Sequence, residues 1–199
     1  MKIRSEVESE INGLGPEISS EAIKKMFDRL DELQEGDILV LAGSIPASMP
    51  ESMYRDIMKR LADRKLKIAV DATKSLLLNV LPFHPFVIKP NNHELGELFN
   101  VKIKSKDQAV EYAKKLQEMG AQNVIVSMAG EGAVFVGDDG SVFQSEAPKG
   151  TVVNSVGAGD SMVAGFLAGY LGEGDYKEAF KLGVCTGSAS AFSEQLATR

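Results

Sequence analysis

The chain has only one cysteine and no long apolar run, and both features limit the cellular compartments in which it is expected. Cys185 cannot form a disulfide within the chain, which favours a reducing compartment. No stretch reaches the roughly 18 apolar residues of a membrane span, and the N-terminus lacks a signal-peptide apolar core. The formal net charge of −6 argues against a nucleic-acid surface. We therefore expect a cytoplasmic protein without nucleic-acid or membrane partners.

Short apolar runs alternate with segments of helical spacing along most of the sequence. The runs are rich in valine and isoleucine and cover residues 37–43, 67–72, 86–90 and 123–127. Such continuous runs are typical of parallel strands that are buried on both faces. Strands that alternate with helices predict an α/β fold with a mostly parallel central sheet and helices on both faces.

Several helices carry start signals. Ser19 or Ser20 is a candidate N-cap before an apolar stripe. Pro50 is expected in the first turn of the next helix, and Ser105 with Gln108 resembles a capping box.

The alternation changes near residue 130. Residues 132–146 read as a hairpin with Asp139 and Gly140 in its turn, followed by helices at about 158–171 and 175–194. Without a linker or an internal repeat, residues 1–199 are expected to form one α/β domain.

The segment SVGAGDS places Asp160 where a helix begins. Unpaired backbone N–H groups and the helix dipole favour an anion there, and Gly157 and Gly159 permit a close backbone approach. Asp160 is thus a candidate general base, with Gly157, Ala158 and Gly159 as its anion hole. The alternative, that Asp160 only caps the helix, stays open at this point.

The segment IKPNNHELGEL follows a strand, so Lys89, Asn91 and Glu94 are expected at the carboxyl edge of the sheet, where ligands bind. Asn91 and Glu94 lie three residues apart, and their oxygens could organise hydrated Mg²⁺. The alternative is a capping box without any ligand. Residues 126–135 form a glycine-bearing turn after another strand that suits nucleotide phosphates.

Three segments in this order resemble the PfkB branch of the ribokinase-like sugar kinases. They are GSIP at 43–46, KPNNHE at 89–94 and NSVGAGD at 154–160. The segments at 10–19 and 155–166 are most similar to 1-phosphofructokinases and tagatose-6-phosphate kinases. The resemblance implies a three-layer α-β-α, Rossmann-like fold, and transfer of the γ-phosphoryl of ATP to a sugar phosphate with Mg²⁺. Fructose 1-phosphate and tagatose 6-phosphate are the implied substrates, and the family dimerises through its lid.

The resemblance also implies roles for single residues. Asp160 would be the base beside the anion hole, and Asn91 and Glu94 would organise Mg²⁺ through water, with Lys89 nearby. The ATP site would be lined by Ser127, Ala129, Gly130 and Gly132, joined near the adenine by Gly187 and Ser190. Lys2 and Arg4 would lie on the sugar-phosphate side.

The sequence departs from the family pattern in several places. Asn154 replaces the first aspartate of the closing signature, and Ala129 stands where glycine is usual. The first half of the family's substrate site is not represented, so we expect a C-terminal, ATP-binding portion that is inactive alone, with Met1 as an artificial or misassigned start. Two alternatives stay open: a nucleotide-binding module without catalysis, and a ribokinase- or nucleoside-kinase-type enzyme.

The sequence also predicts the surroundings of Asp71 and Cys185. Asp71 ends a predicted strand, where a nucleotide-side role and a cap are both open. Cys185 shares helical spacing with Leu182 and Ala189 and is expected to be a buried small hydrophobe.

Overall fold

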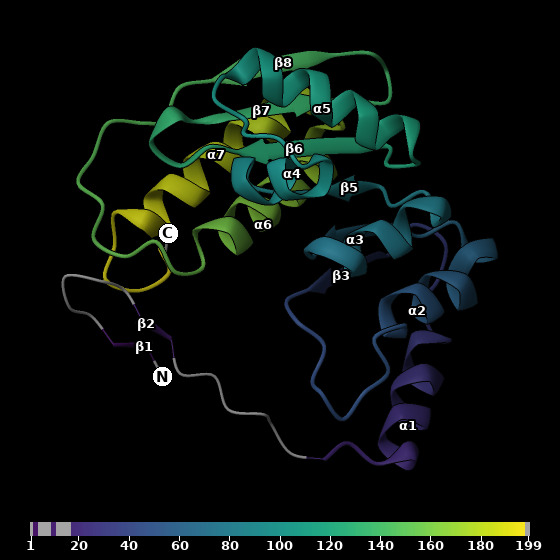
Figure 1. Ribbon diagram of the computed structural model, residues 1–199. Helices are drawn as coiled ribbons and strands as arrows, with labels where there is room; N and C mark the ends of the chain where they lie inside the picture. The colour runs from purple at the N-terminus through teal and green to yellow at the C-terminus, as the bar shows by residue number, and fades with distance from the viewer. Residues whose placement is uncertain (1, 4–8, 11–16, 198–199) are drawn as a thin grey trace.

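The structure, a computed structural model, describes residues 2–3, 9–10 and 17–197 (Figure 1). Its strands are β1 (Lys2–Ile3), β2 (Ser9–Glu10), β3 (Ile38–Ala42), β4 (Lys67–Asp71), β5 (Val87–Ile88), β6 (Asn123–Ser127), β7 (Ala133–Val136) and β8 (Val142–Ser145). Its α-helices are α1 (Ser20–Leu30), α2 (Met53–Leu61), α3 (Lys74–Val80), α4 (Asn92–Phe99), α5 (Lys106–Glu118), α6 (Ala158–Glu173) and α7 (Tyr176–Ala191). Three short 3-10 helices are η1 (Ala62–Arg64), η2 (Leu81–Phe83) and η3 (Ala129–Glu131).

A six-stranded sheet in the order β3-β4-β5-β6-β7-β8 forms the centre of the fold. The pairs from β3 to β6 are parallel, and β7 and β8 add antiparallel strands at one edge. The predicted mostly parallel sheet and the predicted hairpin are therefore confirmed. β5 is shorter than its apolar run, which ends at Pro90, a residue without an N–H to donate. β1 and β2 form a separate antiparallel pair.

Helices cover both faces of the sheet, which gives three layers (Figure 1). On one face, α2, α3, α4 and α5 pack over a core that includes Leu61, Leu95 and Val124. On the other face, α6 and α7 pack over a second core around Phe135 and Phe166. The central strands lie between the two helix layers and contribute side chains to both cores. This is why their sequences are continuous apolar runs.

Glycine brings α6 and α7 into close contact. A Cβ added at Gly169 would lie 2.7 Å from the Cα of Ala179, and one at Gly183 would lie 2.9 Å from the carbonyl oxygen of Met162. A Cβ at Gly187 would likewise lie 3.0 Å from the carbonyl oxygen of Ala158. None of the helices in the described part of the chain has both the length and the apolar character needed to cross a bilayer.

The expectation that Cys185 is buried is wrong, because its side chain is exposed. The buried face of α7 is formed by residues such as Ala179, Gly183, Val184 and Gly187. Cys185 and Leu182 lie on the opposite, solvent-facing side, and Leu182 is 41% exposed. Since the contact with α6 selects small residues, the most hydrophobic side chains do not mark the buried face.

The helix starts largely follow the sequence signals. Ser19 caps α1 by accepting from the amide of Ala22 at 3.2 Å. Ser105 caps α5 by accepting from Gln108, but the Gln108 side chain accepts from Lys104 instead of closing the capping box. Pro50 lies outside α2 rather than in its first turn, and its carbonyl accepts from the amide of Met53.

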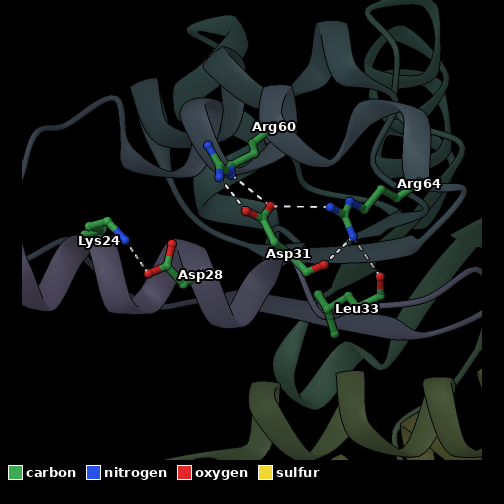
Figure 2. Close-up of polar contacts among 6 residues, drawn as sticks. All are labelled: Lys24, Asp28, Asp31, Leu33, Arg60 and Arg64. Carbon is green, nitrogen blue, oxygen red and sulfur yellow. Dashed lines mark hydrogen bonds and ion pairs between the residues drawn. The ribbon is translucent and has the colours of Figure 1, made fainter.

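Figure 2 shows how α1 is fixed to α2. The Asp31 carboxylate follows the C-terminus of α1 and pairs with Arg60, whose Nε lies 2.9 Å from Oδ1. Arg64 donates to the carbonyl oxygens of Asp31 and Leu33, where α1 ends. The hydrogen bond from Arg60 lowers the pKa of Asp31. Arg64 thus satisfies carbonyl oxygens at the end of α1 that the helix itself leaves unpaired.

Candidate functional site

The carboxyl ends of the parallel strands gather polar residues from distant parts of the chain. β4 ends at Asp71, Lys89 follows β5, and β6 ends at Ser127. A single parallel bridge joins Asn91 to Ser127, so the segment after β5 stays beside β6. α6 begins at the same edge, since Gly159 lies next to Lys89. This is the edge at which open α/β sheets bind ligands.

Lys89 and Asp71 form a largely buried ion pair at this edge. Lys89 Nζ lies 3.3 Å from Asp71 Oδ2, and the two side chains are 8% and 18% exposed. Burial raises the pKa of Asp71, the Lys89 ammonium opposes that rise, and the nearby carboxylates of Glu94 and Asp160 add to it. Three carboxylates and one lysine therefore share one electrostatic environment. Such a group favours an additional cation.

The N-terminus of α6 lies directly against Lys89. Gly157 is the N-cap in a left-handed conformation, with φ 77° and ψ 0°. A Cβ at Gly159 would come 3.0 Å from Lys89 Nζ, so a glycine leaves the ammonium open to this side. Asp160 lies in the first turn and is exposed. It is not the N-cap, and within the described residues no side chain caps this helix; the capping interpretation of Asp160 is therefore wrong.

Asn91 and Glu94 form a complete capping box at the start of α4. Asn91 Oδ1 accepts from the amides of His93 and Glu94, each at 2.9 Å, and Glu94 Oε2 accepts from the Asn91 amide at 2.8 Å. The amide oxygen of Asn91 is thus already used, which fits contact with a metal through water better than direct ligation. Among the residues described, no group of three or more His, Cys, Asp or Glu side chains is arranged to hold a metal ion by itself. A metal here would need oxygen ligands from another molecule.

A cavity of about 580 Å³ opens beside the α6 N-terminus. Its lining includes six residues that the sequence predicted for the site, namely Ser127, Ala129, Gly130, Ala158, Gly159 and Gly187. The volume falls within the range of about 300–1,000 Å³ that small-molecule sites occupy. The predicted ATP-site and anion-hole residues therefore largely converge on one cavity.

Part of the cavity wall was not predicted. Residues 147–150 and Val152, between the hairpin and α6, line one side, and Met162, Ala191 and Phe192 line the apolar end. A Cβ at Gly150 would lie 2.4 Å from the Phe192 ring, so that loop lies flat against the aromatic ring. This loop has no regular period in the sequence, and only its glycine and proline hinted at a special conformation.

Several predicted residues do not line this cavity, among them Lys89, Asn91, Glu94 and Asp160. Ser190 is buried, and its hydroxyl lies 2.7 Å from that of Ser161, which ties α7 to α6. Gly132 has φ +91°, and a Cβ there would lie 2.0 Å from the carbonyl oxygen of Ser145, so it permits the approach of the hairpin. Gly157 is the N-cap of α6, and a Cβ there would lie 2.5 Å from Leu196 Cδ2.

The remaining predicted residues lie elsewhere or outside the described part. Lys2 belongs to β1, and Arg4 lies outside the described residues. Ala129, where glycine is usual in the family, has φ +49°, a left-handed conformation that glycine adopts without strain.

The comparisons with known proteins agree with this geometry. The sequence profile of a family described as pfkB family carbohydrate kinase matches residues 2–198. A 1-phosphofructokinase from Bacillus subtilis is 50% identical over 198 residues, which is 100% of this chain and 65% of the relative. A D-tagatose-1-phosphate kinase from Bacillus licheniformis is 33% identical over 98% of this chain and 64% of its own length. The chain therefore spans about 65% of the first of these relatives.

Solved structures show the same fold. Phosphofructokinase-2 from Escherichia coli, in complex with substrates and products, superposes with a TM-score of 0.85 at 26% identity, over 94% of this chain and 61% of that chain. A ribokinase from Arabidopsis thaliana, with ribose and ATP, shares the fold with a TM-score of 0.70 at 20% identity, over 88% of this chain and 54% of its own. The three-layer ribokinase-like architecture expected from the sequence is confirmed.

Proposed function

The chain belongs to the pfkB family of carbohydrate kinases, and from this membership we propose that it carries the ATP-binding half of a sugar-phosphate kinase. The observation that carries the proposal is that the start of α6 lines a 580 Å³ cavity with Ala158 and Gly159 and also lies against the Lys89 ammonium. Asp160 is the next residue in the same helical turn. Because the chain spans about 65% of the Bacillus subtilis relative, the activity of a whole enzyme is part of this proposal.

The cavity fits a nucleotide in both of its parts. Its apolar end, with Val152, Met162 and Phe192, suits a flat base. Its other end has the first amides of α6, and the ammonium of Lys89 lies against Gly159. Backbone N–H groups at a helix start and a lysine are typical partners of phosphate.

The excess of carboxylates at the phosphate end fits Mg²⁺. The carboxylates of Glu94 and Asp160 both help to raise the pKa of Asp71 there, and Lys89 is the counter-charge. Mg²⁺ keeps several waters and shares its ligands with substrate phosphates, so it would be held by the nucleotide and, through water, by Asn91 and Glu94. The ion would supply charge neutralisation between the phosphates.

In the proposed reaction, Asp160 accepts the proton of the attacking sugar hydroxyl. The amides of residues 157–159 hold the oxygens of the transferred phosphoryl group, and Lys89 stabilises the charge that develops on them. Asp160 is suited to this role because it is exposed in the first turn of α6 and does not cap the helix. The ion pair with Asp71 holds Lys89 in place.

We infer fructose 1-phosphate as the preferred acceptor, because relatives named 1-phosphofructokinase include the 50% identical Bacillus subtilis protein. The tagatose relative is named for tagatose 1-phosphate, so tagatose 6-phosphate has no support from that name. A cytoplasmic location, where ATP is abundant, belongs to the same proposal.

The experiment is ADP formation by this chain and by a chimaera in which it replaces the matching 198 residues of the Bacillus subtilis relative. The acceptors are fructose 1-phosphate, both tagatose phosphates, ribose and a nucleoside. We expect turnover of fructose 1-phosphate by the chimaera, a loss of about 10²–10⁴-fold on Asp160→Asn, and little or no turnover by the chain alone. A chimaera that binds Mg·ADP but phosphorylates no acceptor would leave a nucleotide-binding module without catalysis as the better description.

A further inference from the structure

A second cavity, of about 560 Å³, lies beside the nucleotide cavity. Its lining comes from the start of α4, the segment before α5 and the η3 turn: Asn92, His93, Lys102, Ile103, Lys104, Met128, Ala129, Gly130 and Glu131. Ala129 and Gly130 line both cavities, so the η3 turn is the wall between them. We refer to this second space as the Lys102–Lys104 cavity.

The two lysines face this cavity because of the backbone between α4 and α5. Ile103 is buried in the core, at 5% exposure, and the lysines on either side of it are exposed. In an extended segment, residues i and i+2 lie on the same side. Both lysines accordingly belong to the lining of the same cavity.

Neither lysine is neutralised by a neighbouring carboxylate. Lys106, two residues further on, pairs with Glu146, and Lys115 pairs with Glu111. Within the described residues, no ion pair within 4.0 Å involves Lys102 or Lys104. Glu131 is the acidic residue of the cavity lining, so the two lysines give the lining a positive balance.

We propose that the Lys102–Lys104 cavity is a second anion site, which binds inorganic phosphate or the phosphate group of a small metabolite. Two ammonium groups supply the charge-assisted hydrogen bonds that a phosphate requires. The Asn92 side chain and the His93 ring supply further polar groups in the lining.

The same lysines could instead hold the distal phosphates of a nucleotide that reaches around the turn. The two sources differ in their competition with ADP. A separate site binds free phosphate while Mg·ADP is present, whereas a site for the nucleotide tail does not.

The test measures inorganic phosphate binding by ³¹P NMR and by thermal unfolding, in saturating Mg·ADP and at constant ionic strength set with chloride. The variant is Lys102→Ala with Lys104→Ala. The control is Lys114→Ala with Lys177→Ala, which removes the same charge from exposed positions on α5 and α7. We expect the phosphate dissociation constant to rise by about tenfold or more in the variant, as the loss of charge-assisted hydrogen bonds predicts, and to be unchanged in the control.

Stabilisation by Mg·ADP should persist in the Lys102→Ala, Lys104→Ala protein, because the nucleotide cavity does not include these side chains. The proposal is overturned if phosphate adds nothing once Mg·ADP is bound, or if it binds the variant as tightly as the wild type. It is also overturned if the variant loses affinity for ADP instead. None of these outcomes decides whether the neighbouring cavity is a kinase site.

Discussion

The Lys89 ammonium lies 3.3 Å from the Asp71 carboxylate, and a Cβ added at Gly159 would come 3.0 Å from the same ammonium. One largely buried cation thus joins the end of β4 to the start of α6. The pair fixes where the helix N-terminus meets the sheet edge. Both the stability of this junction and its anion affinity should depend on it.

Removing the cation should destabilise the fold at neutral pH. Lys89→Met leaves Asp71 as a mostly buried carboxylate without its partner, and breaking buried pairs costs several kcal/mol. Because Asp71 keeps 18% exposure, we expect the free energy of unfolding to fall by about 2 kcal/mol. Urea denaturation measures this change. Adding Asp71→Asn to Lys89→Met should recover part of the loss, and a double variant less stable than Lys89→Met would contradict the pairing.

The pH dependence of stability should carry the signature of Asp71. Burial raises the folded-state pKa of this carboxyl above its unfolded value of roughly 3.9, so the folded state binds the proton more tightly. Its contribution to stability is complete below the unfolded pKa and is lost as the pH rises through the folded pKa. The stability of the wild type relative to Asp71→Asn should therefore increase as the pH falls from about 7 to about 4.

Asp139 provides a control of opposite sign for that experiment. Hydrogen bonds from Ser141 lower the pKa of Asp139, so its contribution is present above the unfolded pKa and is lost in acid. The stability of the wild type relative to Asp139→Asn should fall over the same range. Urea titrations at a series of pH values measure both, and a pH-independent difference for Asp71→Asn would refute the assignment.

A comparison with a second N-cap, Ser105, separates the capping role of Asn91 from its proposed role in ligand binding. Asn91→Ala and Ser105→Ala each remove an N-cap and should each lower the free energy of unfolding by about 1 kcal/mol. Only Asn91→Ala should also reduce the thermal stabilisation by Mg·ADP, because Asn91 pairs with Ser127, a residue of the cavity lining, and Ser105 is not part of that lining. Equal stabilisation of the two variants by Mg·ADP would leave Asn91 with a capping role alone.

The sequence predicted the strands, the hairpin and the starts of several helices because these depend on local patterns. β6 covers residues 123–127 as its apolar run indicates, and the Asn91 capping box is present as its spacing indicates. Burial on α7 was not predictable from hydrophobicity, since glycines such as Gly183 occupy the contact and Cys185 faces solvent. In the candidate site, sequence motifs predicted residues such as Gly159 and Ser127, which line the cavity. The wall at 147–152 was not predicted, because long-range contacts such as that of Gly150 with Phe192 determine the position of this irregular loop.

Two glycines of α6 should respond in opposite directions to the same substitution. Gly169→Ala inserts a Cβ 2.7 Å from the Cα of Ala179 and should destabilise the fold by about 1–3 kcal/mol. Gly172→Ala meets no atom within 4 Å and should stabilise it by about 0.5–1 kcal/mol through helix propensity. Chemical denaturation of both proteins measures the difference, and equal effects would contradict the close contact between α6 and α7.

The most direct test of the central claim is thermal unfolding of the chain with and without Mg·ADP. If the cavity beside the α6 N-terminus is an assembled nucleotide site, ligand at about 100 times its dissociation constant should stabilise the fold by roughly 2.7 kcal/mol and raise the midpoint. A chain that unfolds cooperatively at the same temperature with and without Mg·ADP would contradict the account.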